Sequence, residues 1–188
     1  MKREIILASQ SPRRKELLAK CGAAFAVEAA DIDESFNHDN DLKQEIMNLS
    51  CRKAKAILDK HPDALVIGSD TIVVLDNEVL GKPKDHHDAE RMLRELSGRT
   101  HQVITGLCLL SADACVKDVS VSDVTFAELS EQEIHDYVVS GEADDKAGSY
   151  GIQGKAACFI TGIKGDYYSI MGLPVRKVYE ALKRLGGL

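Results

Sequence analysis

Residues 5–18 read IILASQSPRRKELL. The apolar start predicts a buried strand, and the residues that follow predict a loop and then a helix that begins at Pro12. Ser11 suits the N-cap, and proline suits the first helical position because the N–H it lacks would have no partner there. We therefore expect a strand, a loop and a capped helix in direct succession.

The start of this helix has the chemistry of an anion site. The first N–H groups of a helix lack partners and carry partial positive charge, so a phosphate can bind there. Arg13 and Arg14 would add forked, permanently charged donors where phosphate oxygens lie. The alternative is a capped helix with two solvated arginines, and this stretch alone does not decide between the two.

The composition is typical of a soluble globular protein. The 188 residues suffice for one domain, or one domain with a modest lobe, and 44% are hydrophobic and 29% charged. A formal net charge of −6 argues against broad nucleic-acid binding, although a local basic pocket can still hold a small anion.

The cysteines and the apolar runs indicate the compartment. Five cysteines, none in a Cys-x-x-Cys pair, support neither a disulfide framework nor a structural zinc site. No apolar run approaches the roughly 20 residues of a membrane helix, and the N-terminus lacks the apolar core of a signal peptide. We expect reduced thiols, a cytoplasmic location and no membrane association.

Helical spacing of apolar residues predicts further helices over 41–60, after Asp85, from Ser130 and from Pro174. Residues 85–88 (Asp-His-His-Asp) could suggest a metal cluster, but a helix cap at Asp85 explains them more simply. In the helix over 41–60, Arg52, Lys53 and Lys55 would ordinarily lie on a solvated face.

Strands are expected over 25–27, 64–75, 78–83, 103–110, 116–126 and 158–163. A tight turn at 76–77 would join the second and third of these strands. In the strand over 116–126 the apolar positions change from odd to even, which predicts a bulge near Ser122 and Asp123. A turn is expected over 165–168.

Asp70 stands inside the β-branched run over 64–75, which otherwise predicts a buried strand. Burying a carboxylate is costly unless it is paired, hydrogen-bonded or bound to a metal. Asp70 is therefore a candidate site residue rather than a structural one.

Residues 144–154 are polar and interrupted by glycines, which argues against a helix. Loops of this kind often carry function on a rigid scaffold. The chain contains neither the phosphate-loop motif nor the dinucleotide-binding glycine motif, so those two folds lose support.

Eight stretches, taken together and in this order, resemble the Maf family of nucleotide pyrophosphatases over nearly the whole chain. They are Ser9 to Arg14, Asp33-Glu34, Arg52 to Ala54, Gly68 to Thr71, Gly81 to Pro83, Ser97-Gly98 with Thr100-His101, Asp145 to Gly154, and Gly172 to Pro174. Each stretch is weak alone, but eight in register are specific.

The resemblance implies an α/β fold like that of inosine triphosphate pyrophosphatase, with a mixed, strongly twisted sheet flanked by helices and a central cleft, in a single domain over 1–188. It implies a cytoplasmic homodimer that cleaves nucleoside triphosphates to the monophosphate and pyrophosphate, with Mg²⁺ or Mn²⁺. Such an enzyme would keep unwanted nucleotides from being incorporated. Residues 145–148 with Gln153 look like the branch that acts on dTTP and UTP. The branch that acts on 7-methyl-GTP carries an acid in place of the glutamine.

The resemblance also implies roles for individual residues. Asp70 would be the proton acceptor, and Arg13, Thr71 and Gln153 would set substrate specificity. Other substrate-binding or metal-binding positions that line the pocket correspond to Ser9, Arg14, Glu34, Lys53 and Lys82.

Hydrolysis at the α-phosphorus requires these residue types. Water needs a base, and Asp70 can accept its proton, a step worth roughly 10²- to 10⁴-fold in rate. The negative charge on the phosphate oxygens must be offset by cations. Arg14 would supply one, and Arg13, Lys53 and Lys82 would supply others as members of the catalytic set. Glu34 and Asp70 are the expected metal ligands.

Gln153 has a chemical argument of its own. Its amide can donate to O4 of a pyrimidine and accept from N3–H, which matches the edge shared by uracil and thymine. Cytosine has a donor in place of O4 and an acceptor in place of N3–H. The amide of Gln153 could flip to match both groups, so discrimination would require Gln153 to be held by its neighbours.

Two other functions are open to the sequence. One is a non-catalytic nucleotide-binding regulator of cell division or septum formation, and the other is a metal-dependent phosphatase that releases single phosphates. The presence of both Asp70 and Glu34 favours catalysis over sensing, because a sensor needs no base.

Overall fold

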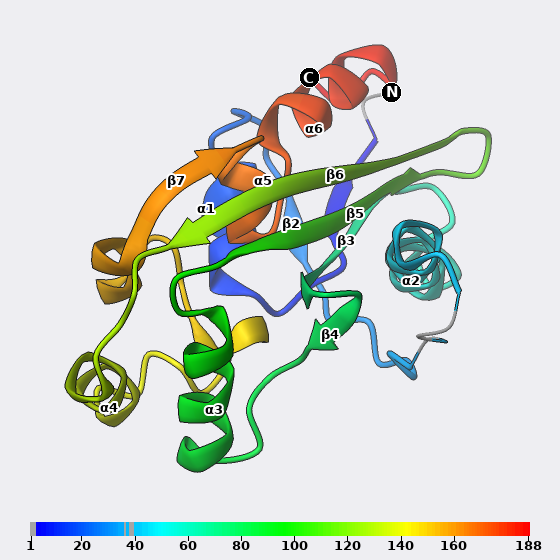
Figure 1. Ribbon diagram of the computed structural model, residues 1–188. Coiled ribbons are helices and arrows are strands. Elements are labelled where there is room, and N and C mark those ends of the chain that lie inside the picture. The colour runs from blue at the N-terminus through cyan, green and yellow to red at the C-terminus, as the bar shows by residue number, and fades with distance from the viewer. Residues whose placement is uncertain (1–2, 36, 38–39) are drawn as a thin grey trace. The chain divides into compact units, whose positions relative to one another are not determined.

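The computed structural model describes residues 3–35, 37 and 40–188 (Figure 1). Its elements are, in chain order, β1 (Ile5–Leu7), α1 (Pro12–Ala19), β2 (Ala26–Val27), α2 (Leu42–Leu58), β3 (Leu65–Leu75), β4 (Glu78–Leu80), α3 (His86–Leu96), β5 (Thr100–Leu110), β6 (Cys115–Phe126), α4 (Glu131–Val139), the 3₁₀ helices η1 (Ala147–Ser149) and η2 (Lys155–Phe159), β7 (Ile160–Lys164), α5 (Tyr167–Met171) and α6 (Val175–Arg184). The strand, loop and capped helix predicted for residues 5–18 are confirmed.

Within the described residues, the strands form one seven-stranded sheet in the order β2-β1-β3-β5-β6-β7, with β4 paired to β3. β1 pairs in parallel with β2 and β3, whereas the β3–β4 and β6–β7 pairs are antiparallel. The expected α/β fold with a mixed sheet and flanking helices is therefore confirmed.

The chain divides into two compact units. The first unit comprises the described residues of Met1–Asp70 with Thr105–Ser120 and Gly172–Leu188, and the second comprises Thr71–Ile104 and Val121–Met171. The strands β3, β5 and β6 contribute residues to both units, and β3 passes from one to the other between Asp70 and Thr71.

In the first unit, helices cover both faces of the sheet (Figure 1). On one face, Ile6 and Val66 pack in one core cluster with Ala54 of α2. On the other face, Ile5 lies beside the chain that follows α6, and α6 packs against α1. Burial on both faces explains why β1 and the first half of β3 are continuous apolar runs without polar alternation.

Two glycines allow α2 to approach the sheet closely. A Cβ added to Gly68 would lie 2.1 Å from the main-chain oxygen of Ser50, and one added to Gly106 would lie 2.4 Å from that of Ile46. Either contact is far too short for a side chain, so the backbone of α2 rests directly on β3 and β5. Because side chains alternate along a strand, the residue two positions after Gly68 faces α2 as well. That residue is Asp70.

In the second unit, α3 packs against α4 and η1. The predicted helix caps are confirmed: Asp85 accepts the main-chain N–H of Asp88 at 2.8 Å, and Ser130 forms a capping box with Glu133. The turn between β3 and β4 is also confirmed, with positive φ angles of 51° at Asp76 and 67° at Asn77.

β6 pairs irregularly with β7 between Thr125 and Phe126, and the bulge predicted near Ser122 and Asp123 stays a prediction. Two other local predictions were wrong. Residues 155–159 form η2 and not the start of a strand, and this turn buries Phe159 in edge contact with Phe126. The expected turn over 165–168 leads into α5, because the carboxylate of Asp166 accepts two N–H groups of that helix.

Candidate active site

The loop between β1 and α1 is organised around two serine hydroxyls. Ser11 is the N-cap of α1 and accepts the main-chain N–H of Arg14. The buried Ser9 hydroxyl accepts the N–H of Ser11 at 3.1 Å and lies 3.4 Å from Nη1 of Arg14. Both hydroxyls therefore contact Arg14, Ser11 at its main-chain N–H and Ser9 at its guanidinium.

Arg14 is held from both sides and is only 13% exposed. Its Nε donates to the main-chain oxygen of Gly172 at 2.9 Å, and its Nη2 lies 3.5 Å from Oδ1 of Asp70. The same Gly172 oxygen accepts the hydroxyl of Ser69 at 3.0 Å. Burial lowers the pKa of the Arg14 guanidinium, and the neighbouring Asp70 opposes that shift. The alternative of two solvated arginines is wrong for Arg14, whereas Arg13 beside it is half-buried.

Lys53 lies between two carboxylates. Its Nζ contacts Oδ2 of Asp70 in a short ion pair and lies 2.8 Å from Oε1 of Glu34. The Lys53 side chain is 8% exposed and that of Asp70 is 16% exposed. The general expectation of a solvated face is therefore wrong for Lys53, although it is right for Lys55, which lies exposed and pairs with Asp59. Asp70 thus stands between one lysine and one arginine.

Arg52 holds the acidic loop around Glu34. From the sequence, Arg52 was named only in a motif and as one of the side chains expected on a solvated face. Its guanidinium donates to the main-chain oxygens of Asp33 at 2.9 Å and Ser35 at 2.7 Å, on either side of Glu34. The signal that could have identified it is its position next to Lys53, because consecutive helical residues point in different directions. One then reaches the carboxylates, and the other reaches the backbone of the loop.

The structure therefore brings together five of the predicted residues in the first unit: Ser9, Arg14, Glu34, Lys53 and Asp70. Arg13 belongs to the same unit, in the first turn of α1.

The other three predicted residues belong to the second unit. Gly148 packs on Val73 of β3, which shares a face with Thr71, and the Gly148 N–H donates to Gly81, the residue before Lys82, at 3.0 Å. The loop that begins there continues to Gln153, whose side chain is exposed. Lys82 and Gln153 thus lie beside or on one loop, and Thr71 lies two residues before Val73 on the strand that this loop contacts.

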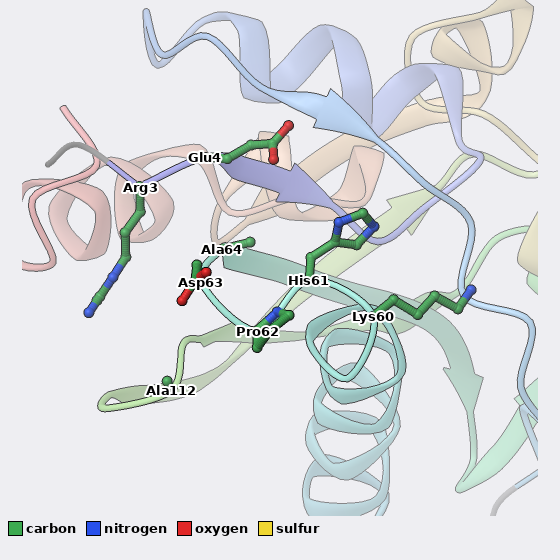
Figure 2. Close-up of a pocket in the computed structure, with 8 residues that line it drawn as sticks. All are labelled: Arg3, Glu4, Lys60, His61, Pro62, Asp63, Ala64 and Ala112. Carbon is green, nitrogen blue, oxygen red and sulfur yellow. The ribbon is translucent and has the colours of Figure 1, made fainter.

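A separate cavity of about 710 Å³ opens in the first unit (Figure 2). It is lined by Arg3, Glu4, Lys60, His61, Pro62, Asp63, Ala64 and Ala112. Its basic side chains have partners: Arg3 pairs with Asp113 at 2.9 Å, and both Lys60 and His61 contact Glu28. No residue predicted for the site lines this cavity, so we do not assign it to the activity.

The sequence can be compared with those of known proteins. The family described as "Maf-like protein" matches residues 4–185 of the chain. The chain is a member of the Maf family. The expected resemblance is therefore confirmed, and the match runs through both units of this Maf-like protein.

Three relatives of this chain share one name. The chain is 48% identical over 184 residues to a protein of Koribacter versatilis, covering 98% of this chain and 95% of the relative. It is 46% identical to a protein of Geobacillus sp., with 98% and 99% covered, and 47% identical to one of Symbiobacterium thermophilum, with 97% and 94% covered. Each of the three is named dTTP/UTP pyrophosphatase.

Two features are absent from the described residues. No group of three or more His, Cys, Asp or Glu side chains in this part of the chain could hold a metal ion. None of its helices has both the length and the apolar composition needed to span a membrane.

Proposed function

We propose that this protein hydrolyses dTTP and UTP at the α-phosphorus to the nucleoside monophosphate and pyrophosphate. The observation that carries the proposal is Asp70, a mostly buried carboxylate held between Lys53 and Arg14. The similarity to three dTTP/UTP pyrophosphatases over almost the whole chain supports the same reaction and the same substrates.

In this proposal Asp70 is the general base. Its carboxylate accepts a proton from water as the water oxygen bonds to the α-phosphorus and the bond to the bridging oxygen breaks. Pyrophosphate then leaves with the electron pair of that bond. The negative charge that spreads over the phosphate oxygens is offset by the cationic side chains of Arg13, Arg14, Lys53 and Lys82. Ser9 orients Arg14 through its hydroxyl.

Glu34 and Asp70 fit a divalent cation, Mg²⁺ or Mn²⁺. Both carboxylates approach the same Nζ of Lys53, so hard oxygen ligands from two segments converge on one positive charge. Mg²⁺ in nucleotide enzymes is usually held by one or two carboxylates together with substrate phosphates, which matches this pair. When bound, such an ion would neutralise charge on the triphosphate.

Base selection is assigned to Arg13, Thr71 and Gln153. An amide at position 153 can donate to O4 and accept from N3–H, and uracil and thymine share both of these groups. We further propose that both units act as one functional domain over 1–188, in a cytoplasmic homodimer without stable nucleic-acid binding.

A panel of nucleoside triphosphates, assayed for pyrophosphate and orthophosphate with and without EDTA, tests the proposal. Pyrophosphate should be the first product from dTTP and UTP, and EDTA should abolish its release. Orthophosphate as the first product would contradict the proposal in favour of a phosphatase. Nucleotide binding without any turnover would favour a regulator.

A further inference from the structure

The loop that carries Gln153 is held at three points by α4 and the turn after it. The hydroxyl of Tyr137, a buried residue of α4, accepts the main-chain N–H of Gly151 at 3.1 Å. The carboxylate of Glu142 accepts the main-chain N–H of Lys155 at 2.9 Å. The main-chain oxygen of Glu142 accepts Nζ of Lys146 at 2.6 Å. These contacts lie before and after Gln153 in the chain.

The two glycines on either side of Gln153 show how closely the loop lies on these groups. A Cβ on Gly154 would lie 2.1 Å from Oε2 of Glu142, and a Cβ on Gly151 would lie 2.8 Å from Cε of Lys146. The same Cβ on Gly151 would lie 3.7 Å from Oε1 of Gln153. The loop backbone therefore rests directly on Glu142 and Lys146, with no room for side chains between them.

Glu142 stands on a rigid support. The helix α4 before it begins with a capping box and packs against α3. The chain then turns through Gly141, with φ of 77°, a conformation that glycine adopts without strain. The turn therefore presents Glu142 to the loop from a capped helix that packs against α3.

We propose that Glu142 is a positioning residue for base selection. Its carboxylate and its main-chain oxygen fix both ends of the segment 146–155, so that the amide of Gln153 projects in one direction. The inference rests on the proposed reading of the base by Gln153. It assigns the direction of that amide to a residue that does not itself contact the nucleotide.

The chemistry of discrimination requires such a support. Cytosine presents a donor where uracil presents O4, and an acceptor where uracil presents N3–H. A glutamine on a loose loop could rotate its amide and satisfy either base. A glutamine on a fixed loop leaves unpaired polar groups with cytosine, and unpaired groups are what make hydrogen-bonding sites selective.

The test is the ratio of kcat/KM for UTP to that for CTP, together with amide hydrogen exchange at Lys155. We expect Glu142→Ala to lower the ratio about fivefold, the equivalent of one hydrogen bond, and to speed exchange at Lys155. Glu142→Gln should restore both, because its amide oxygen still accepts the Lys155 N–H. The ratio is a readout that a general loss of stability would not change.

The matched control is Asp166→Ala. Asp166 is also a carboxylate of the second unit that accepts main-chain N–H groups, those of Tyr168 and Ser169 at 3.1 Å, but it stands before α5 and not in α4. Its loss should lower stability without changing the UTP to CTP ratio. Lys146→Met gives a second variant that keeps the methylenes against Gly151 and removes the donor to Glu142, and it should also lower the ratio.

The outcomes separate this inference from the proposed function. If Gln153→Glu changes the ratio but neither Glu142→Ala nor Lys146→Met does, the positioning role is wrong and base reading stands. If Asp166→Ala lowers the ratio as much as Glu142→Ala, the effect is one of stability and the positioning role is wrong. If the wild type shows no preference for UTP over CTP, base reading by Gln153 fails and the positioning role fails with it.

Discussion

In the first unit, Asp70 is held by charged side chains that come from far apart in the chain, whereas in the second unit Gln153 is carried by a loop that is fixed through main-chain atoms. The contacts of Asp70 with Lys53 and Arg14 are ion pairs between mostly buried groups. The loop of Gln153 instead depends on N–H groups accepted by Tyr137 and Glu142.

The charged cluster around Asp70 should therefore determine the rate of hydrolysis, and the loop of Gln153 should determine which nucleotide is chosen. A buried cluster of charges is sensitive to the loss of any member, because the partner left behind is an unpaired charge away from water. A loop held by single hydrogen bonds loses much less when one of them is removed. Substitutions in the cluster of Asp70, Lys53 and Arg14 should therefore reduce the rate on every nucleotide, and substitutions in the loop should change the choice among nucleotides.

Asp70→Asn should produce the largest effect. The amide cannot accept the proton of the attacking water, so kcat for dTTP should fall by roughly 10²- to 10⁴-fold. Steady-state release of pyrophosphate measures this, and Asp76→Asn in the turn after the same strand is the matched control. A decrease below tenfold for Asp70→Asn, with the fold intact, would exclude it as the base.

Lys53→Met should have the next largest effect. The substitution leaves Glu34 and Asp70 without the ammonium that they share, and a charge-assisted hydrogen bond of about 1.5–3 kcal/mol corresponds to roughly 10- to 150-fold in kcat/KM. Lys55→Met, two residues along the same helix, removes only an exposed pair with Asp59 and should change nothing. Equal kinetics for the two variants would remove Lys53 from the site.

Gln153→Glu should lower kcat/KM for both dTTP and UTP by about tenfold, since the carboxylate repels O4 and offers it no donor. The free energy of unfolding should stay close to that of the wild type because Gln153 is exposed. Gln44→Glu, at an exposed position of α2, is the control. Unchanged kcat/KM on both nucleotides would contradict the assignment of Gln153 to base selection.

The smallest effect on activity is expected at His101, which instead affects how stability depends on pH. Nε2 of His101 shares a hydrogen bond of 2.7 Å with the hydroxyl of Tyr150, which lies two residues before Ile152. Nδ1 of His101 has no hydrogen-bond partner within the described part of the chain. Burial lowers the pKa of His101 from 6.5 to about 4. The unfolded chain therefore binds a proton below pH 6.5 that the folded chain does not bind until about pH 4.

Stability should accordingly fall as the pH is lowered through this window, by an amount on the order of 3 kcal/mol for the His101 contribution. His101→Gln should remove that contribution and flatten the curve, whereas His87→Gln, at an exposed position, should not. Denaturant unfolding at several pH values measures it. Parallel curves for the wild type and His101→Gln would show that His101 is not the titrating group.

Local sequence signals predicted much of the fold. The caps at Ser11, Asp85 and Ser130 follow from hydrogen bonds that reach only a few residues along the chain, so a short window of sequence contains the whole interaction. The 3₁₀ helix η2 was missed because it depends on burying Phe159 against aromatic rings from elsewhere in the second unit.

The candidate site shows the same limit. Residue types identified Asp70 as an acid in an apolar strand, and the family motifs supplied its companions. The sequence could not show that Lys53 is buried while Lys55 is exposed, because that depends on how closely α2 rests on Gly68 and Gly106. The role of the Gly172 oxygen as a shared acceptor was equally invisible, since it joins residues 158 positions apart.

The central claim is hydrolysis at the α-phosphorus. Its most direct test is a single turnover of dTTP in ¹⁸O-labelled water, with the label located by mass spectrometry. Attack of the water activated by Asp70 at the α-phosphorus predicts one ¹⁸O in dTMP and none in pyrophosphate. Label in the pyrophosphate, or in released orthophosphate, would place the attack on another phosphorus and contradict the account.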